Sequence, residues 1–249
     1  MKFVQQFLSR VLAIAAVALL GVGHSAPCRA AQINYGDFNS NPPGVMFLNV
    51  TESSGTDAVP LYGPPTSVGQ QLGFTPTPAF SAAASGGSVD VTDGQLNYTI
   101  MSDDVTTVNA QEGGNFSLTG IGTPVTSVFG ALSLRATVTQ INGVDVTPIV
   151  LPQSNASFQA NLVTNPGANQ PWSLATSVDV ATQLATLGFG SGQNATKVDV
   201  VIDNQLVAVS ELLSDASIIK TRFGIPEPGS LALAALAMCG VGAVSRKRR

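Results

Sequence analysis

The chain has 249 residues, of which 10% are charged, 25 are Gly and 15 are Pro. This length accommodates one large domain or two small ones. β-Branched residues favour pleated surfaces, and Gly, Pro and Asn favour turns, so the composition predicts a β-rich chain with many turns. The hydrophobic share of 44% excludes a chain that is disordered throughout.

The charges are distributed unevenly along the sequence. Between residues 31 and 225 there are fourteen Asp and Glu but only four cations, Arg135, Lys197, Lys220 and Arg222. Phosphate groups are bound by clustered Lys and Arg, so this acidic stretch excludes nucleic acid as a partner. The same stretch contains neither His nor Cys, which excludes Ser-His-Asp triads and zinc or copper sites.

The N-terminus predicts export. Lys2 and Arg10 provide a positive start, residues 11–23 are uninterruptedly apolar, and small residues lead to a cleavage position between Ala30 and Ala31. This is the pattern of a signal peptide over residues 1–30, with signal peptidase and the export machinery as partners. An uncleaved anchor and lipidation at Cys28 are the alternatives.

The stretch 31–224 shows period-two alternation, which indicates half-buried strands. It predicts an all-β fold, an antiparallel β-sandwich of jelly-roll or immunoglobulin-like type. One sandwich is favoured over two subdomains split near 147–154, where Pro148 and Pro152 lie. The strands are expected at residues 45–50, 71–74, 95–100, 115–118, 131–140, 157–162, 197–202, 206–209 and 217–223.

Local signals predict the connections. Asn142-Gly143 is typical of a type I′ hairpin turn, and Asp203-Asn204 looks like a second turn. A short helix is expected over residues 181–187. The Pro-rich stretches 41–43 and 60–65 are expected in loops or at edges.

Few residues of the stretch 31–224 point to chemistry. The one cofactor to consider is a calcium ion, which carboxylates would bind. The alternative for these Asp residues is a role in turns, since Asp next to Gly is typical of turns. Trp172 is either a core residue or a sugar contact. Glycoside hydrolysis needs two facing carboxyl groups, and the glutamates of this stretch are Glu52, Glu112 and Glu211. The calcium candidates are Asp90, Asp93, Asp103 and Asp104.

The C-terminus combines an apolar run with a basic end. Eighteen uncharged residues separate Glu227 from Arg246, enough for a helix of about 27 Å. A transmembrane helix over about 229–245 is therefore predicted, and the basic end places the C-terminus in the cytoplasm. A buried core helix or a plain membrane anchor are the alternatives. The basic end consists of Arg246, Lys247, Arg248 and Arg249.

Pro226, Glu227 and Pro228 stand immediately before this run. The triplet, the apolar span and the basic end together resemble a PEP-CTERM sorting domain, over residues 225–249. The resemblance implies recognition and processing by an exosortase, a membrane enzyme, and delivery to the cell surface or to an extracellular, exopolysaccharide-rich matrix. We therefore expect a non-enzymatic surface or matrix protein, with exopolysaccharide as a partner. The alternative is a polysaccharide-active enzyme or a carbohydrate-binding module carried by the same tail.

Overall fold

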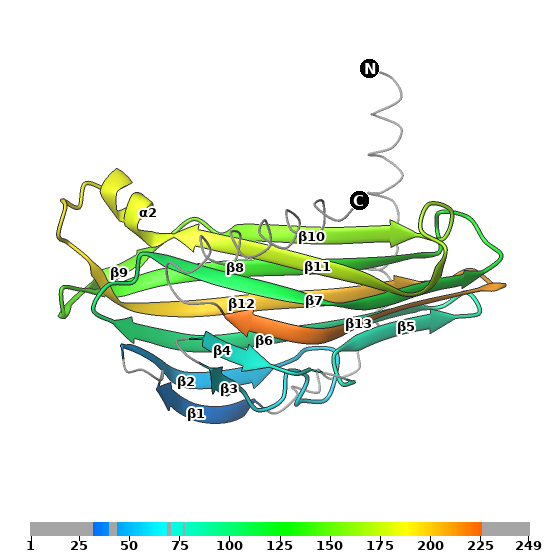
Figure 1. Ribbon diagram of the computed structural model, residues 1–249, viewed down its shortest axis with the longest axis horizontal. Coiled ribbons are helices and arrows are strands. Elements are labelled where there is room, and N and C mark those ends of the chain that lie inside the picture. The colour runs from blue at the N-terminus through cyan, green and yellow to red at the C-terminus, as the bar shows by residue number, and fades with distance from the viewer. Residues whose placement is uncertain (1–31, 40–43, 69–70, 77, 226–249) are drawn as a thin grey trace, which may run out of the picture.

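The computed structural model describes residues 32–39, 44–68, 71–76 and 78–225. These residues form two antiparallel sheets packed face to face, with a single short helix at one end (Figure 1). The predicted all-β antiparallel sandwich is confirmed. The elements are β1 (Ile33–Asn39), β2 (Val45–Ser53), β3 (Thr66–Val68), β4 (Gln71–Phe74), β5 (Ser81–Ser85), β6 (Val89–Ser102), β7 (Thr107–Gly120), β8 (Ser127–Ile141), β9 (Val144–Val150), β10 (Ser154–Asn161), β11 (Gly167–Asp179), α2 (Val180–Thr186), β12 (Ala195–Val209) and β13 (Ser214–Ile225).

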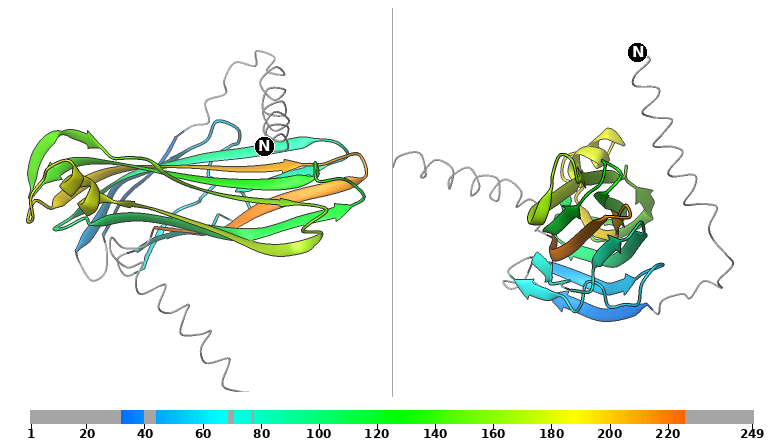
Figure 2. Two further views of the ribbon diagram at one scale, coloured as in Figure 1. Left: turned by 90° about the horizontal axis from the view of Figure 1, so that it is seen from above. Right: turned by 90° about the vertical axis from the view of Figure 1, so that its right-hand side faces the viewer.

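The two sheets differ in strand order. Figure 2 shows the two layers from two further sides. The seven-stranded sheet has the order β1-β2-β6-β12-β8-β10, and β9 also pairs with β8. The six-stranded sheet has the order β11-β7-β13-β4-β3, and β5 also pairs with β13. Both β9 and β10 pair with β8, so the chain on either side of residues 151–153 belongs to the same sheet.

The longest strands follow the predicted alternation. In β6, β8 and β12 every second side chain is buried, as expected for strands with one face against a core. The expected turn at Asp203-Asn204 is wrong, because β12 runs through it without interruption. Asn204 pairs with Gly94 on one side and with Leu132 on the other, so this centre of the strand is held from both sides.

Two of the local predictions are confirmed. Asn142 and Gly143 both have positive φ, at 49° and 76°, as a type I′ turn requires between β8 and β9. The expected short helix is α2, whose N-terminus is capped by Asp179: its carboxylate accepts a hydrogen bond from the Thr182 amide at 2.9 Å.

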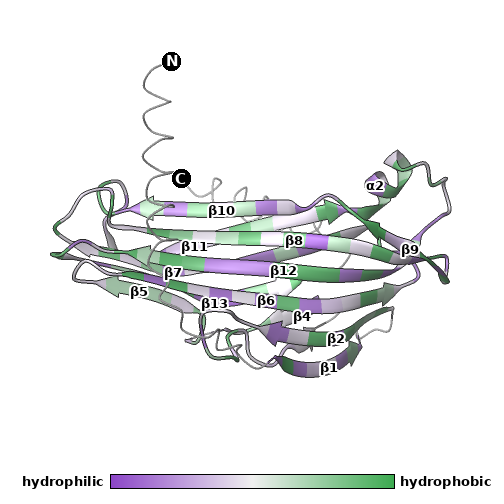
Figure 3. Ribbon diagram, turned by 180° about the vertical axis from the view of Figure 1, so that it is seen from behind, coloured by the Kyte–Doolittle hydropathy of each residue, from purple (hydrophilic) through white to green (hydrophobic). Residues whose placement is uncertain are grey.

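The core lies between the two sheets, where the inward-facing Val, Leu, Ile and Phe residues meet. Its aromatic part is a cluster in which Tyr62 makes edge-on contacts with Phe74, Phe80 and Phe223, with ring centroids 5.1 to 5.9 Å apart. Coloured by hydropathy, β12 carries hydrophilic bands along its middle (Figure 3).

The predictions for the two ends fall outside the described residues. These are the cleavage position Ala30/Ala31, the Pro226-Glu227-Pro228 motif, and the basic end from Arg246 to Arg249. Within the part of the chain that the structure describes, no helix has the length and apolar character needed to span a membrane.

Candidate functional site

The outer face of the seven-stranded sheet carries a concentration of polar side chains on its central strands. In β6, Leu96 and Tyr98 are buried, so Gln95 and Asn97 face outward. In β12 the buried positions are occupied by Ile202, Asn204 and Leu206, which turns Asp203 and Gln205 outward. The sequence alternation therefore sets the direction of each side chain, strand by strand.

The strand register brings these outward positions into line. Gln95 pairs with Asp203, Asp203 with Ser133, and Ser133 with Asn155, while Ser53 of β2 pairs with Gln95. One row of polar residues thus crosses five strands. With neighbouring strands about 4.8 Å apart, the row is about 19 Å long. We call Ser53, Gln95, Asp203, Ser133 and Asn155 the polar row.

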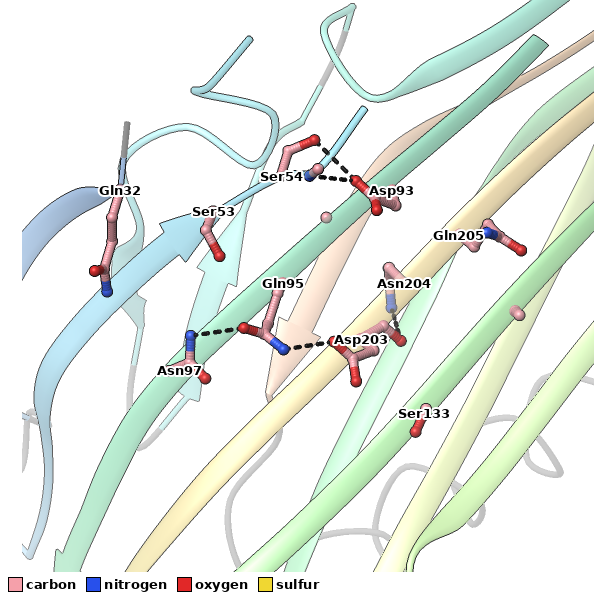
Figure 4. Close-up of a pocket in the computed structure, with 13 residues that line it drawn as sticks. Gln32, Ser53, Ser54, Asp93, Gln95, Asn97, Ser133, Asp203, Asn204 and Gln205 are labelled. Atoms are coloured by element: carbon pink, nitrogen blue, oxygen red, sulfur yellow. Dashed lines mark hydrogen bonds between the residues drawn. The ribbon is translucent and has the colours of Figure 1, made fainter. Parts of the chain in front are cut away.

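Hydrogen bonds fix the orientation of the side chains in and beside this row (Figure 4). Gln95 Nε2 donates to Asp203 Oδ1 at 2.7 Å, and Asn97 Nδ2 lies 3.5 Å from Gln95 Oε1. The guanidinium of Arg135 lies 3.6 Å from Asp203 Oδ2. The row therefore presents amide and carboxylate groups in fixed directions rather than as free side chains.

The contacts continue from Arg135 toward the edge of the sheet. Arg135 Nε donates to Gln153 Oε1 at 2.8 Å, and Gln153 Nε2 donates to Asn155 Oδ1 at 2.7 Å. Six side chains on four segments are thereby connected from Asn97 to Asn155. Both Arg135 and Asp203 are about half exposed, so their ion pair adds little stability and leaves polar atoms accessible to a ligand.

Four of the five residues of the polar row, Ser53, Gln95, Asp203 and Ser133, line a hollow of about 810 Å³. It is lined by residues of β6, β12 and β8 and, on one side, by Ser53 at the end of β2 and by Ser54 just after it (Figure 4). The volume is that of a typical small-ligand site, but the lining is more polar than apolar. Such a lining suits a ligand that is itself covered with hydrogen-bonding groups.

Asp93 holds the rim of the hollow in place. Its Oδ1 accepts hydrogen bonds from Ser54 Oγ at 2.9 Å, from the Gly55 amide at 2.7 Å and from Thr56 through both amide and hydroxyl. Partial burial raises the pKa of Asp93, but these hydrogen bonds outweigh it and the pKa is lowered. The carboxylate is therefore occupied in fixing the loop that follows β2.

The four calcium candidates are not brought together. Asp90 accepts a hydrogen bond from the Ala83 amide at 2.7 Å, and Asp93 holds the rim loop. Asp103 and Asp104 follow β6 at the far end of the sheet and line two other hollows. Among the described residues, no group of three or more His, Cys, Asp or Glu side chains is arranged to hold a metal ion.

The glutamates considered for hydrolysis lie outside the hollow. Glu52 is buried and accepts hydrogen bonds from the amides of Leu61 and Tyr62 and from the Tyr35 hydroxyl. Glu112 is buried between the sheets, and Glu211 binds a loop through Thr123. The carboxylates that do line the hollow are Asp93 and Asp203, and both already accept hydrogen bonds or an ion pair.

Trp172 is a core residue, which is one of the two interpretations that the sequence left open. It is 4% exposed, stacks on Phe158 at 5.9 Å and donates from Nε1 to the Ile219 carbonyl at 3.2 Å. Among the described residues that line the hollow there is no aromatic ring. The hollow therefore offers a ligand hydrogen-bonding groups rather than a ring for stacking.

Comparison with known proteins gives fold-level likeness only. No protein-family model matches the chain. No curated protein matches it either. Among solved structures, the carbohydrate-binding module TmCBM61 in complex with β-1,4-galactotriose is 6% identical, with 63% of this chain and 70% of that chain covered and a TM-score of 0.22.

Two further solved structures have similar values. A module described as specific for non-crystalline cellulose, CBM28, is 8% identical over 66% of this chain and 76% of its own, with a TM-score of 0.24. A loop-swap mutant of Necallimastix patriciarum Xyn11A is 10% identical over 83% of this chain and 98% of its own, with a TM-score of 0.22. Scores this low carry no argument about ligand or activity, and we base none on them.

Proposed function

We propose that this chain is an exported, non-enzymatic surface or matrix protein whose jelly-roll-type body binds a neutral polysaccharide. The observation that carries the proposal is the polar row, most of which lines a hollow on one sheet face, with Gln95 and Asp203 oriented there by a mutual hydrogen bond. Sugar hydroxyls both donate and accept hydrogen bonds. Amide and carboxylate side chains at regular spacing can therefore engage successive hydroxyls of an extended glycan.

The charge of the body favours a neutral glycan over an acidic one. Fourteen acidic residues against four cations between residues 31 and 225 repel polyanions at long range. Arg135, which contacts Asp203 of the hollow, is engaged by Asp203 and Gln153. The described residues that line the hollow include no Lys or Arg to bind a uronic acid or a sulfate.

The surroundings of the two carboxylates in the hollow favour binding without hydrolysis. A glycosidase needs one protonated and one ionised carboxyl group facing the scissile bond. In the hollow, Asp93 is held ionised by the hydrogen bonds from residues 54–56, and Asp203 is occupied by Gln95 and Arg135. A general acid needs a raised pKa, whereas the hydrogen bonds to Asp93 lower the pKa of that carboxyl group.

Native gel electrophoresis through immobilised neutral polysaccharides tests this function. We expect at least one neutral β-linked polysaccharide to retard the protein, with no retardation by an acidic one and no shortening of the polysaccharide chains. Gln95→Ala should weaken retardation, whereas Gln111→Ala, the same change at an exposed position of β7 in the other sheet, should not. Release of oligosaccharides would support the hydrolase alternative instead.

The sorting part of the proposal rests on the C-terminal sequence. By its resemblance to PEP-CTERM domains, the Pro226-Glu227-Pro228 motif is a substrate of an exosortase, and the chain is processed there after export. Mass spectrometry of the exported protein should find a C-terminus upstream of the basic end. An intact Arg249 on the surface form would leave a plain anchor as the function of the tail.

A further inference from the structure

The six-stranded sheet contains a buried pair of reactive groups, Lys220 on β13 and Glu112 on β7. Nζ of Lys220 lies 2.7 Å from Oε2 of Glu112, and both side chains are 0% exposed. The two residues are on neighbouring strands of the sheet, and both face the interior of the sandwich. Lys and Glu are rarely buried this completely, so the pair needs an explanation.

Aromatic rings enclose the amine. Nζ lies 3.8 Å from the centroid of the Phe80 ring, 5.1 Å from that of Tyr62 and 5.5 Å from that of Phe223. We call these three rings the aromatic cage. They attract the ammonium weakly and exclude water from it. The nearby Glu52 is already engaged by the amides of Leu61 and Tyr62, so Glu112 is the carboxyl group in contact with the amine.

The backbone is built to bring this pair together. β13 has a register shift between Lys220, which pairs with Gly114, and Arg222, which pairs with Gly113. An added Cβ at Gly114 would lie 1.8 Å from the Ile219 carbonyl oxygen. The bulge therefore requires glycine on β7. Regular alternation up to Lys220 directs this side chain inward, and the bulge after it brings Phe223 inward as well, beside the amine.

Burial favours the uncharged forms of both groups. It lowers the pKa of Lys220 to about 8 against the opposing attraction of Glu112, and it raises the pKa of Glu112. Transfer of one proton from the ammonium to the carboxylate gives a neutral amine beside a neutral carboxylic acid. A neutral amine is the nucleophilic form of lysine, and an acid whose hydroxyl leaves as water is its simplest acceptor.

We propose that Lys220 and Glu112 are joined by an intramolecular amide bond. Nζ attacks Cδ of the protonated carboxyl group, and the Nζ–Cδ bond forms. The Cδ–O bond breaks, and the oxygen leaves as one water molecule with its own proton and one from Nζ. No oxidant, reductant or other reagent is required. The fold holds the amine and the carboxyl group in contact, which corresponds to an effective concentration of one group at the other of about 10⁵ M or more. This proximity takes the place of an external catalyst.

The bond would covalently link β7 to β13, the last strand described before the C-terminal tail. The stretch 31–225 has no cysteine, so no disulfide can supply this cross-link. A link between residues 112 and 220 closes a long loop of the unfolded chain, which restricts the unfolded state in the way that a disulfide does. The inference does not depend on glycan binding.

Peptide mass spectrometry of the full chain tests the bond directly. The purified protein is unfolded and digested with trypsin and a second protease. We expect a branched peptide containing both Glu112 and Lys220, lighter than the two linear peptides by one water, with no tryptic cleavage after Lys220. Lys220→Met and Lys220→Arg should both give only linear peptides.

The measurement on the unsubstituted chain decides the matter even if the variants fold poorly. A linear peptide with cleavage after Lys220 as the main species would overturn the proposal. So would a branched peptide that joins Lys220 to another residue, such as an asparagine, which would be lighter by one ammonia instead of one water.

Discussion

Glu112→Ala should lower the free energy of unfolding by at least about 3 kcal/mol, and up to about 5 kcal/mol, the usual cost of a buried charge left without compensation. The substitution leaves the Lys220 amine inside the aromatic cage with no carboxyl group beside it, and it also prevents the amide cross-link to β7. Equilibrium unfolding in urea at neutral pH measures the change.

The double variant Glu112→Ala with Lys220→Met is the matched control. It lacks the Glu112 side chain as the single variant does but has no buried charge, so it should be more stable than Glu112→Ala alone. A double variant no more stable than the single one would show that the buried amine is not the source of the loss.

The difference between the two variants should depend on pH. Burial is the main cause that lowers the pKa of Lys220 to about 8, and Glu112 opposes it, so Glu112→Ala lowers this pKa further. A folded-state pKa below the unfolded value of 10.5 means that the unfolded chain binds more protons. Glu112→Ala is therefore less stable than the double variant by the full amount below the folded-state pKa of Lys220. This deficit in unfolding free energy shrinks as the pH rises toward 10.5. A deficit that grows over this range would contradict the assignment.

Trp172→Ala should cost about 3 to 5 kcal/mol of unfolding free energy, the usual loss for a buried Trp. The substitution removes the stack on Phe158 and the hydrogen bond to Ile219, and it opens space beside Gly130. Trp172→Phe should cost clearly less, because a ring still fills most of the site. Thermal and urea unfolding of the unsubstituted protein and of the two variants measure the order of their stabilities.

The conservative variant also separates a core role from a ligand role. Trp172 lies outside the lining of the hollow, so Trp172→Phe should leave polysaccharide retardation unchanged. A folded Trp172→Phe protein that no longer binds polysaccharide would place this side chain at the binding face and contradict the structure.

The alternation on β6, β8 and β12 was enough to predict the fold class, because long half-buried strands carry a clear period of two. The same signal failed for β7, of which only residues 115–118 were expected. Gly113 and Gly114 look like a loop in the sequence, but they are strand residues where the bulge of β13 approaches too closely for a Cβ. This requirement of a neighbouring strand is invisible in the local sequence.

β11 was missed for a related reason. Pro171 argues against a central strand, yet it is compatible with an edge strand, and β11 lies at the edge of the six-stranded sheet. Its position in the sheet depends on pairing with β7, which the sequence does not reveal.

The candidate site could not be predicted, because it depends on register. Gln95, Asp203 and Ser133 come from strands far apart in the chain and align only through the pairing of β6, β12 and β8. Asp203 with Asn204 looked like a turn because both residues favour turns in isolation. Within β12, Asp203 instead meets Gln95 and Arg135 on the outer face, and pairing on both sides holds the strand straight.

The central claim is that the polar row binds polysaccharide, and an affinity measurement on paired variants tests it most directly. With a polysaccharide that retards the protein, we predict that Asp203→Ala weakens binding about tenfold or more, since a hydrogen bond to a charged group contributes about 1.5 kcal/mol or more. Gln95→Ala should weaken binding about two- to tenfold, since a hydrogen bond to a neutral group contributes about 0.5 to 1.5 kcal/mol. Asp215→Ala and Gln111→Ala, the same changes at exposed positions of the six-stranded sheet, should bind as the unsubstituted protein does. Equal affinity of all four variants would contradict the account.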